Sequence, residues 1–137
     1  MCKVENPKRF IAAAIAVVVF TLGYDWFVNT QLLMDTYLQT PQLWREVADM
    51  QSKGPWMLAH QIAISVLVSF IFIQNYEAKG ISEGVRFGLI IGLLLGLVNS
   101  ITYAWMPISM ELALSWLASS IVHGLGAGVL LALIYRR

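Results

Sequence analysis

Nine polar residues that could take part in chemistry lie inside or beside long apolar stretches of this sequence. They are Asp25, Asn29, His60, Gln61, Asn99, Ser100, Ser119, Ser120 and His123. Polar side chains are costly inside a bilayer and mark functional sites by default. A spacing of four residues places two side chains on one helix face. Three pairs have this spacing: Asp25 and Asn29, Asn99 and Tyr103, Ser119 and His123.

This pattern predicts a polar pocket for a small solute, because several helices direct polar groups to one level. The residues expected to line it are Asp25, Asn29, His60, Gln61, Asn99, Tyr103, Ser119 and His123. A pocket with a few convergent polar groups and a carboxylate is typical of small-molecule sites. We expect Asp25, His60 and His123 to lie close together in it.

The two histidines allow other chemistry as well. A b-type haem needs one imidazole from each of two facing helices, and His60 and His123 could supply them. With Asp25 as a third ligand, the same pair could hold a metal ion. No C-x-x-C-H attachment motif is present. The leading interpretation therefore includes no cofactor and no metal, and haem b is kept as an alternative.

The composition indicates a membrane protein. Of the 137 residues, 58% are hydrophobic and 12% are charged, whereas a soluble domain has about 25% charged residues. The net charge is only +1, which excludes nucleic-acid binding, because that function requires a concentrated basic patch. The single cysteine, Cys2, excludes an intramolecular disulfide and a cysteine zinc site. Enzyme signatures such as G-x-S-x-G and H-E-x-x-H are missing, so we expect no enzyme.

Four stretches are long and apolar enough for helices that cross a bilayer, which takes about 20 residues. They cover about 10–28, 56–75, 84–104 and 112–135. The predicted fold class is therefore all-α, an integral membrane four-helix bundle that forms a single transmembrane domain over residues 1–137. The first stretch differs from a signal peptide, because it ends at Tyr24-Asp25-Trp26-Phe27 instead of a small-residue cleavage site.

Basic residues predict the orientation, because they concentrate on the cytoplasmic side of membrane proteins. Seven fall on the side of both termini: Lys3, Lys8, Arg9, Lys79, Arg86, Arg136 and Arg137. The other side has two, Arg45 and Lys53. We expect a multi-pass protein of the bacterial inner membrane with both termini in the cytoplasm.

The connector 29–55 is expected on the periplasmic side. Thr40 can cap a helix that begins at Pro41, and apolar residues then recur at helical spacing. Gly54-Pro55 would end it. This predicts one amphipathic helix over about 41–53, lying on the outer membrane surface. A lid over the bundle is the alternative.

Small residues spaced by four predict close helix packing. The third stretch contains Gly84, Gly88, Gly92 and Gly96, and the fourth contains Ser120, Gly124 and Gly128. Glycine allows the close backbone contact that holds helices together in lipid. We expect the two rows to meet within one chain, with a homodimer as the alternative. Ser82 is expected to cap the third helix.

Two segments resemble a group of small, uncharacterised bacterial inner-membrane proteins with four spans. They are Tyr24-Asp25-Trp26-Phe27 and the run NYEAKGISEGVRFG at 75–88. The resemblance covers most of the chain. It implies the four-span topology, and it implies no activity and no residue roles.

The function predicted from these observations is binding or transport of a small solute through a periplasm-facing polar pocket. An accessory subunit of a larger membrane complex is the first alternative, in which the glycine and polar faces would be docking surfaces. A haem-bearing electron carrier is the second. The expected partners are the lipid bilayer, a small-molecule ligand and, in the homodimer alternative, a second copy of the chain.

Overall fold

The computed structural model describes residues 4–135, and in this range every regular element is a helix. The elements are α1 (Pro7–Phe27), η1 (Val28–Leu32), α2 (Met34–Leu38), η2 (Pro41–Leu43), α3 (Val47–Ser52), α4 (Gly54–Gln74), α5 (Ile81–Ser100), η3 (Ile101–Ala104) and α6 (Met110–Ile134). The all-α bundle predicted from the sequence is confirmed. Its four long helices are the four apolar stretches, and each is long and apolar enough to cross a membrane.

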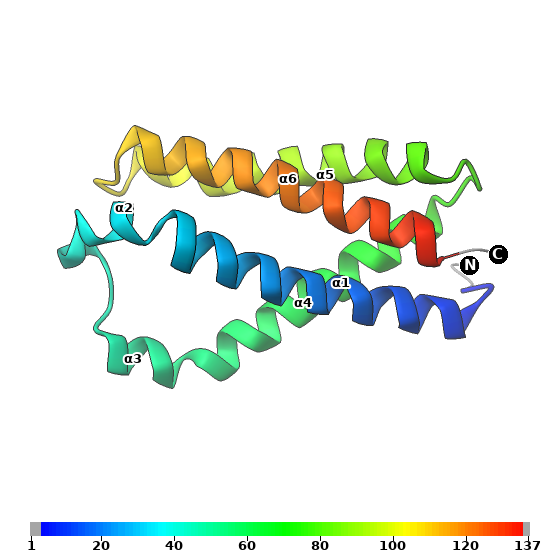
Figure 1. Ribbon diagram of the computed structural model, residues 1–137, viewed down its shortest axis with the longest axis horizontal. Helices are drawn as coiled ribbons and strands as arrows, with labels where there is room; N and C mark the ends of the chain where they lie inside the picture. Colours follow the sequence, from blue (N-terminus) through cyan, green and yellow to red (C-terminus); the bar gives the residue numbers. More distant parts are fainter. Residues whose placement is uncertain (1–3, 136–137) are drawn as a thin grey trace.

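The bundle has two distinct ends (Figure 1). At one end, which we call the connector end, lie α2, η2 and α3. At the other, which we call the terminal end, lie the 75–80 turn and both ends of the described chain. Helix α1 continues into η1, so the first apolar helix runs to Leu32 instead of about 28. The longest connector is therefore shorter than the sequence suggested.

Local sequence explains where several helices begin. Asn6 caps α1, since its side-chain oxygen accepts a hydrogen bond from the Arg9 amide at 3.2 Å. Ser109 caps α6 in the same way, with a hydrogen bond of 3.1 Å from the Leu112 amide. Pro55 lies in the first turn of α4, where a missing backbone N–H costs nothing.

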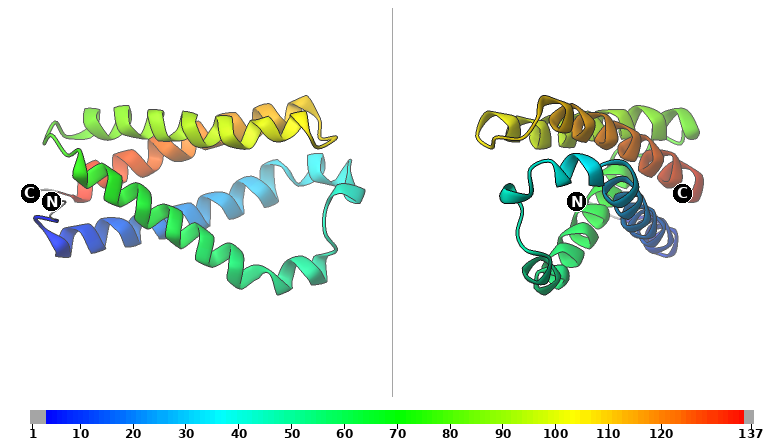
Figure 2. Two further views of the ribbon diagram at one scale, coloured as in Figure 1. Left: turned by 180° about the vertical axis from the view of Figure 1, so that it is seen from behind. Right: turned by 60° about the vertical axis from the view of Figure 1, so that its left-hand side comes forward.

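Helices α5 and α6 form the tightest pair in the structure (Figure 2). The two rows of small residues face each other: Gly84 lies against Gly128, Gly88 against Gly124, Gly92 against Ser120 and Ile121, and Gly96 against Leu117. A Cβ added to Gly92 would lie 2.7 Å from the Ser120 carbonyl oxygen. Because backbone meets backbone here, no side chain fits between the two helices at these positions.

Helix α4 is packed at one end only. Its buried side chains are Ser65 at the middle and Ser69, Phe72 and Ile73 toward the terminal end. There Phe72 and Tyr76 pack in a core with Leu131 and Tyr135. Toward the connector end α4 splays away from α5 and α6 (Figures 1 and 2), and Trp56 is 75% exposed. The bundle is therefore closed at the terminal end and open toward the connector.

The segment 41–53 is helical in two pieces, whereas one continuous amphipathic helix was expected. Thr40 precedes the short η2 helix but makes no side-chain cap. Trp44 then turns to extended backbone (φ −105°, ψ 151°), because its indole packs inward on Tyr37 and Trp116. Gly54-Pro55 begins α4 instead of ending the connector helix. Burial of Trp44 thus outweighs the helical pattern around it.

The turn before α5 also differs from the expectation. Ser82 does not cap the helix, since its hydroxyl donates to the Lys79 carbonyl at 3.0 Å. The group that organises the turn is Glu83, which is 4% exposed. Its two carboxylate oxygens accept hydrogen bonds from the amides of Glu77 and Lys79, at 2.7 and 2.9 Å.

Candidate solute-binding cavity

A cavity of about 370 Å³ lies between the four long helices in the half nearer the connector. Its lining residues are Thr21, Tyr24, Asp25, His60, Gln61, Ile64, Leu95, Val98, Asn99, Ser119, Ser120 and His123. Six of the eight residues expected to line a pocket are among them. The structure thus brings Asp25, His60 and His123 to one cavity, as the depth of these residues in the predicted spans suggested.

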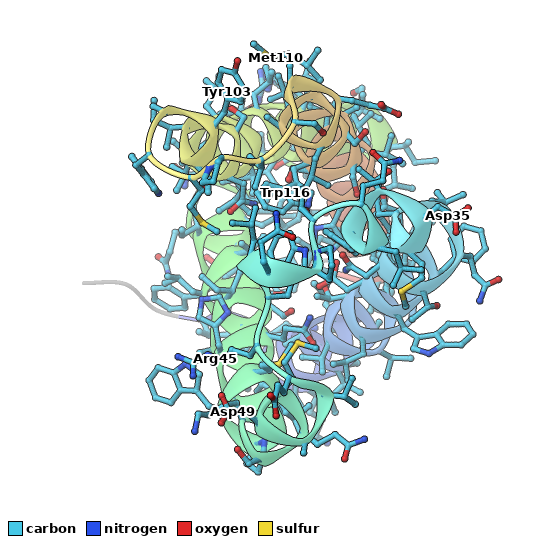
Figure 3. The ribbon with its side chains drawn as sticks, turned by 90° about the vertical axis from the view of Figure 1, so that its left-hand side faces the viewer. Asp35, Arg45, Asp49, Tyr103, Met110 and Trp116 are labelled. Atoms are coloured by element: carbon cyan, nitrogen blue, oxygen red, sulfur yellow. The ribbon has the colours of Figure 1, made fainter. Side chains whose placement is uncertain are left out.

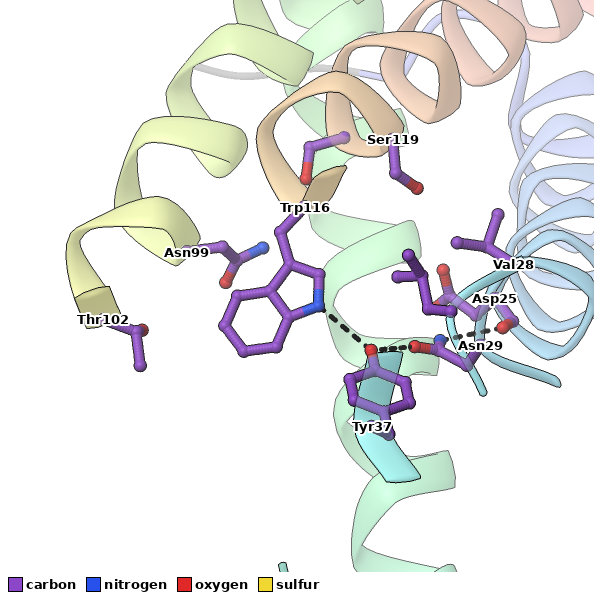
Figure 4. A pocket seen from close by; sticks show the side chains of 10 residues that line it. Asp25, Val28, Asn29, Tyr37, Asn99, Thr102, Trp116 and Ser119 are labelled. Carbon is purple, nitrogen blue, oxygen red and sulfur yellow. Dashed lines mark hydrogen bonds between the residues drawn. The ribbon is translucent and has the colours of Figure 1, made fainter. Parts of the chain in front are cut away.

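A second cavity, of about 400 Å³, adjoins the first toward the connector end (Figure 4). The two share Asp25, Asn99, Ser119 and Ser120. The second is also lined by Val28, Asn29, Leu33, Tyr37, Thr102 and Trp116. Together they form a polar space that runs from the middle of the bundle to the connector.

Tyr103 is the predicted lining residue that lies outside both cavities. It is 46% exposed, in η3 at the edge of the bundle, whereas Trp116 lies near the centre of the connector end (Figure 3). The α-helical spacing with Asn99 fails there, because α5 ends at Ser100 and continues as a 3-10 helix.

Asp25 is fixed by the helix opposite. Gln61 of α4 donates a hydrogen bond from Nε2 to the Asp25 Oδ2 atom at 2.6 Å. The Asn29 side chain does not contact this carboxylate, because it donates to the Asp25 backbone carbonyl at 2.8 Å. Asp25 forms no ion pair with any other residue in 4–135. A carboxylate is therefore positioned at the cavity wall without a lysine or arginine beside it.

His123 is held by hydroxyls and aromatic rings. Its Nε2 lies 2.9 Å from Thr21 Oγ1, and Ser65 donates to the same oxygen at 3.3 Å. The imidazole stacks on Phe20 at a centroid distance of 5.5 Å and an interplanar angle of 2°, and it also contacts the Tyr24 ring. The ring is thus fixed between α1 and α6, and haem ligation through Nε2 would require breaking the bond to Thr21.

Tyr24 ties α1 to α6 beside this histidine. Its hydroxyl donates to the Ser119 carbonyl at 2.9 Å and lies 3.2 Å from the Ser119 hydroxyl.

Among residues 4–135, no group of three histidine, cysteine or acidic side chains is arranged to hold a metal ion.

Three lining side chains have polar atoms without a hydrogen-bond partner in the described residues. His60, Asn99 and Ser120 make no side-chain hydrogen bond with any other described residue. They come from three helices, α4, α5 and α6. Polar groups on membrane-spanning helices usually have a partner in the protein, in a water-filled cavity or in a ligand. These three groups and Asp25 are therefore the ones that a bound solute would meet.

Sequence reasoning missed the residues that close the connector side of the cavity. The Tyr37 hydroxyl donates to Asn29 Oδ1 at 2.6 Å and accepts from Trp116 Nε1 at 3.0 Å. Trp44 donates to the Tyr37 carbonyl at 3.1 Å. Burial raises the pKa of the Tyr37 phenol above its usual value, so it stays a hydrogen-bond donor. The sequence signal that could have revealed these residues is the pair of aromatic side chains at 37 and 44, in the segment predicted to be a connector.

The cavity does not extend to the terminal end. Beyond His123 there is a space of only about 10 Å³, lined by apolar groups together with Thr21 and Ser65, enough for about one water. Ser69 donates to the Ser65 carbonyl at 2.7 Å, so its hydroxyl is bonded within α4. Beyond it lies the apolar core around Phe72 and Leu131.

The length and composition of the four long helices indicate a multi-pass membrane protein, and its helical bundle contains a polar cavity that opens toward one end. No family model, no curated protein and no solved structure matches the chain. The resemblance to small four-span inner-membrane proteins therefore stays a prediction.

Proposed function

We propose that this chain is a small inner-membrane protein that binds a small polar solute in the cavity around Asp25 and moves it across the bilayer, with no catalytic step. The observation that carries the proposal is the set of unbonded polar groups on three helices, His60, Asn99 and Ser120, which line the same cavity as the Asp25 carboxylate. Polar groups placed this way in a membrane-spanning region are costly unless a ligand or water meets them.

The one-sided shape supports entry from the side that the connector faces. The cavity reaches the connector through the space beside Tyr37 and Trp116. It ends at the core that contains Phe72 and Leu131. A transport cycle would require this core to separate, as in alternating access.

The distribution of basic residues supports the proposed orientation, with the terminal end in the cytoplasm and the connector in the periplasm. We expect single cysteines at Lys79 and at Glu46, in a Cys2→Ser background, to react with a membrane-impermeant maleimide from opposite sides. Lys79 should react only from the cytoplasmic side of inverted vesicles, and Glu46 only in intact spheroplasts. Both side chains are exposed. Labelling of both from one side would contradict the four-span topology.

Solute binding can be tested without knowing the solute. The protein is purified in nanodiscs, denatured, and the released small molecules are identified by mass spectrometry. The variant Asn99→Leu fills the cavity with an apolar side chain, so it should lose a polar compound that the wild type retains. Ser100→Leu is the matched control, since Ser100 lies outside both cavities and donates to its own helix at Leu97. Equal compound profiles from wild type and Asn99→Leu would contradict the proposal.

The accessory-subunit alternative has less support in this geometry. It needs the glycine rows as docking surfaces, and the rows are occupied by each other within the chain. Of the two docking surfaces that this alternative needs, the polar face then remains. Co-purification of a fixed stoichiometric partner from membranes would favour it.

A further inference from the structure

The cavity contains one fixed charge, and that charge is negative. Asp25 is the only acidic residue that lines either cavity, and no lysine or arginine lines them. Four of the six lysines and arginines in residues 4–135 pair elsewhere: Arg45 and Lys53 with Asp49, and Lys79 and Arg86 with Glu77. The other two, Lys8 and Arg9, lie in the first turn of α1 at the terminal end. A partly buried carboxylate attracts a cation more strongly than a carboxylate in bulk water does. No lysine or arginine of residues 4–135 therefore balances the charge of Asp25.

The other titratable groups that line the two cavities are tyrosines and histidines, which carry no permanent positive charge. They are Tyr24, His60 and His123, with Tyr37 in the adjoining cavity. Since Ser65 donates to Thr21 Oγ1, the Thr21 hydroxyl hydrogen is free to bond His123 Nε2. A neutral imidazole with its proton on Nδ1 satisfies this arrangement.

Resting on the function proposed above, we propose that the solute is a small organic monocation, an alkylammonium compound whose charged head binds at Asp25. Gln61 bonds only Oδ2 of the carboxylate, which leaves Oδ1 for the ammonium group. The side-chain oxygens of Asn99 and Ser120 are further acceptors without a partner in the described chain. The Tyr24 ring and the Trp116 ring add faces of the kind that attract cations.

The rest of the lining suits an alkyl group better than a bare metal ion. Ile64, Leu95 and Val98 add an apolar part to the lining, beside the polar residues of α4 and α5. Hard cations take about six or more oxygen ligands, whereas the cavity volume of about 370 Å³ far exceeds the space of one ion. A head-and-tail solute uses both the carboxylate and the apolar part of the lining.

The charge preference is measurable with a thiol at the cavity wall. The variant Ser120→Cys, in a Cys2→Ser background, reacts with a trimethylammonium-ethyl and a sulfonato-ethyl methanethiosulfonate at about pH 8, where ordinary imidazoles are neutral. The ratio of the two rates is divided by the ratio at Gln39→Cys, an exposed connector position outside the two cavities. We expect a preference for the cationic reagent of about tenfold or more.

The preference should depend on Asp25 alone. Adding Asp25→Asn should bring the ratio to that of the control thiol, and Asp25→Glu should keep it. Asp35→Asn is the matched control, because Asp35 is an exposed acid on the connector, away from the centre of the bundle (Figure 3). In the Ser120→Cys protein, n-butylammonium should slow labelling by neutral N-ethylmaleimide, whereas 1-butanol and butyrate should not.

The outcomes separate this inference from the function on which it rests. If no reagent reaches Ser120→Cys, the cavity is closed and the solute-binding function fails with it. If both charged reagents react with the same ratio as at Gln39→Cys, the cavity is open and only the cation inference is overturned. Protection by sodium chloride equal to that by n-butylammonium would assign the site to inorganic cations and overturn the alkylammonium proposal.

Discussion

Replacing Gly88 with alanine is expected to destabilise the bundle by about 3 kcal/mol, at the upper end of the cost of overpacking. The added Cβ would overlap the Gly124 carbonyl and approach the Leu125 Cα at 2.9 Å. These are backbone atoms that cannot rotate away, so α5 and α6 would have to separate along their length. Gly88→Leu should abolish the folded bundle. Unfolding monitored by circular dichroism during dodecyl sulfate titration measures the loss.

The matched control for this variant is Gly23→Ala. Gly23 also lies in a membrane-spanning helix, but nothing lies within 4 Å of a Cβ added there. Alanine favours a helix over glycine by about 1 kcal/mol, so Gly23→Ala should be neutral or slightly stabilising. Equal effects of the two variants would show that the α5–α6 contact does not depend on close glycine packing.

Much of the fold was predictable, because lipid imposes simple rules. Backbone groups in a bilayer must be bonded internally, so a long apolar stretch is a helix. The spacing of Gly84, Gly88, Gly92 and Gly96 identified the buried face of α5, since all four are buried. The position of α4 was not predictable, because its apolar residues do not mark a buried face. Trp56 and Leu58, for example, are apolar and exposed.

The candidate site was predictable in its membership and not in its bonds. Depth along the helices placed Asp25, His60 and His123 at one level, and they line one cavity. Their direct partners follow from side-chain geometry, which spacing does not reveal: Asp25 bonds Gln61, and His123 bonds Thr21. No two of the three are hydrogen bonded to each other within the described residues.

The connector shows where periodicity fails. Apolar residues at helical spacing predicted one helix over about 41–53, but Trp44 and Trp116 pack at a centroid distance of 6.5 Å, and this contact bends the chain at 44–46. A long-range aromatic contact has no signature in local spacing. Tyr37 was overlooked for the same reason, since Trp116 lies 79 residues away in the chain.

We expect Glu83→Ala to destabilise the protein by about 3 kcal/mol, because the Glu83 carboxylate holds the 75–80 turn. The variant removes both hydrogen bonds that the carboxylate accepts from the turn, and a bond to a charged group contributes about 1.5–3 kcal/mol. The turn needs this support, because Ala78 and Gly80 have positive φ values of 59° and 69°. A non-glycine residue in that region costs about 1 kcal/mol or more.

The neighbouring variant Ser82→Ala is the matched control for Glu83→Ala, because Ser82 is exposed and bonds only the Lys79 carbonyl. It should change stability by no more than about 0.5 kcal/mol, as surface substitutions usually do. Glu83→Gln should fall between the two, since one amide oxygen can still accept. Hydrogen exchange gives a local readout: the Glu77 and Lys79 amides should lose protection in Glu83→Ala and keep it in Ser82→Ala. If Ser82→Ala proved the more damaging change, the expectation that serine caps the helix would be restored and the role of Glu83 would be wrong. The physical reason to expect otherwise is burial, because a carboxylate that is 4% exposed is tolerated only when its oxygens are bonded.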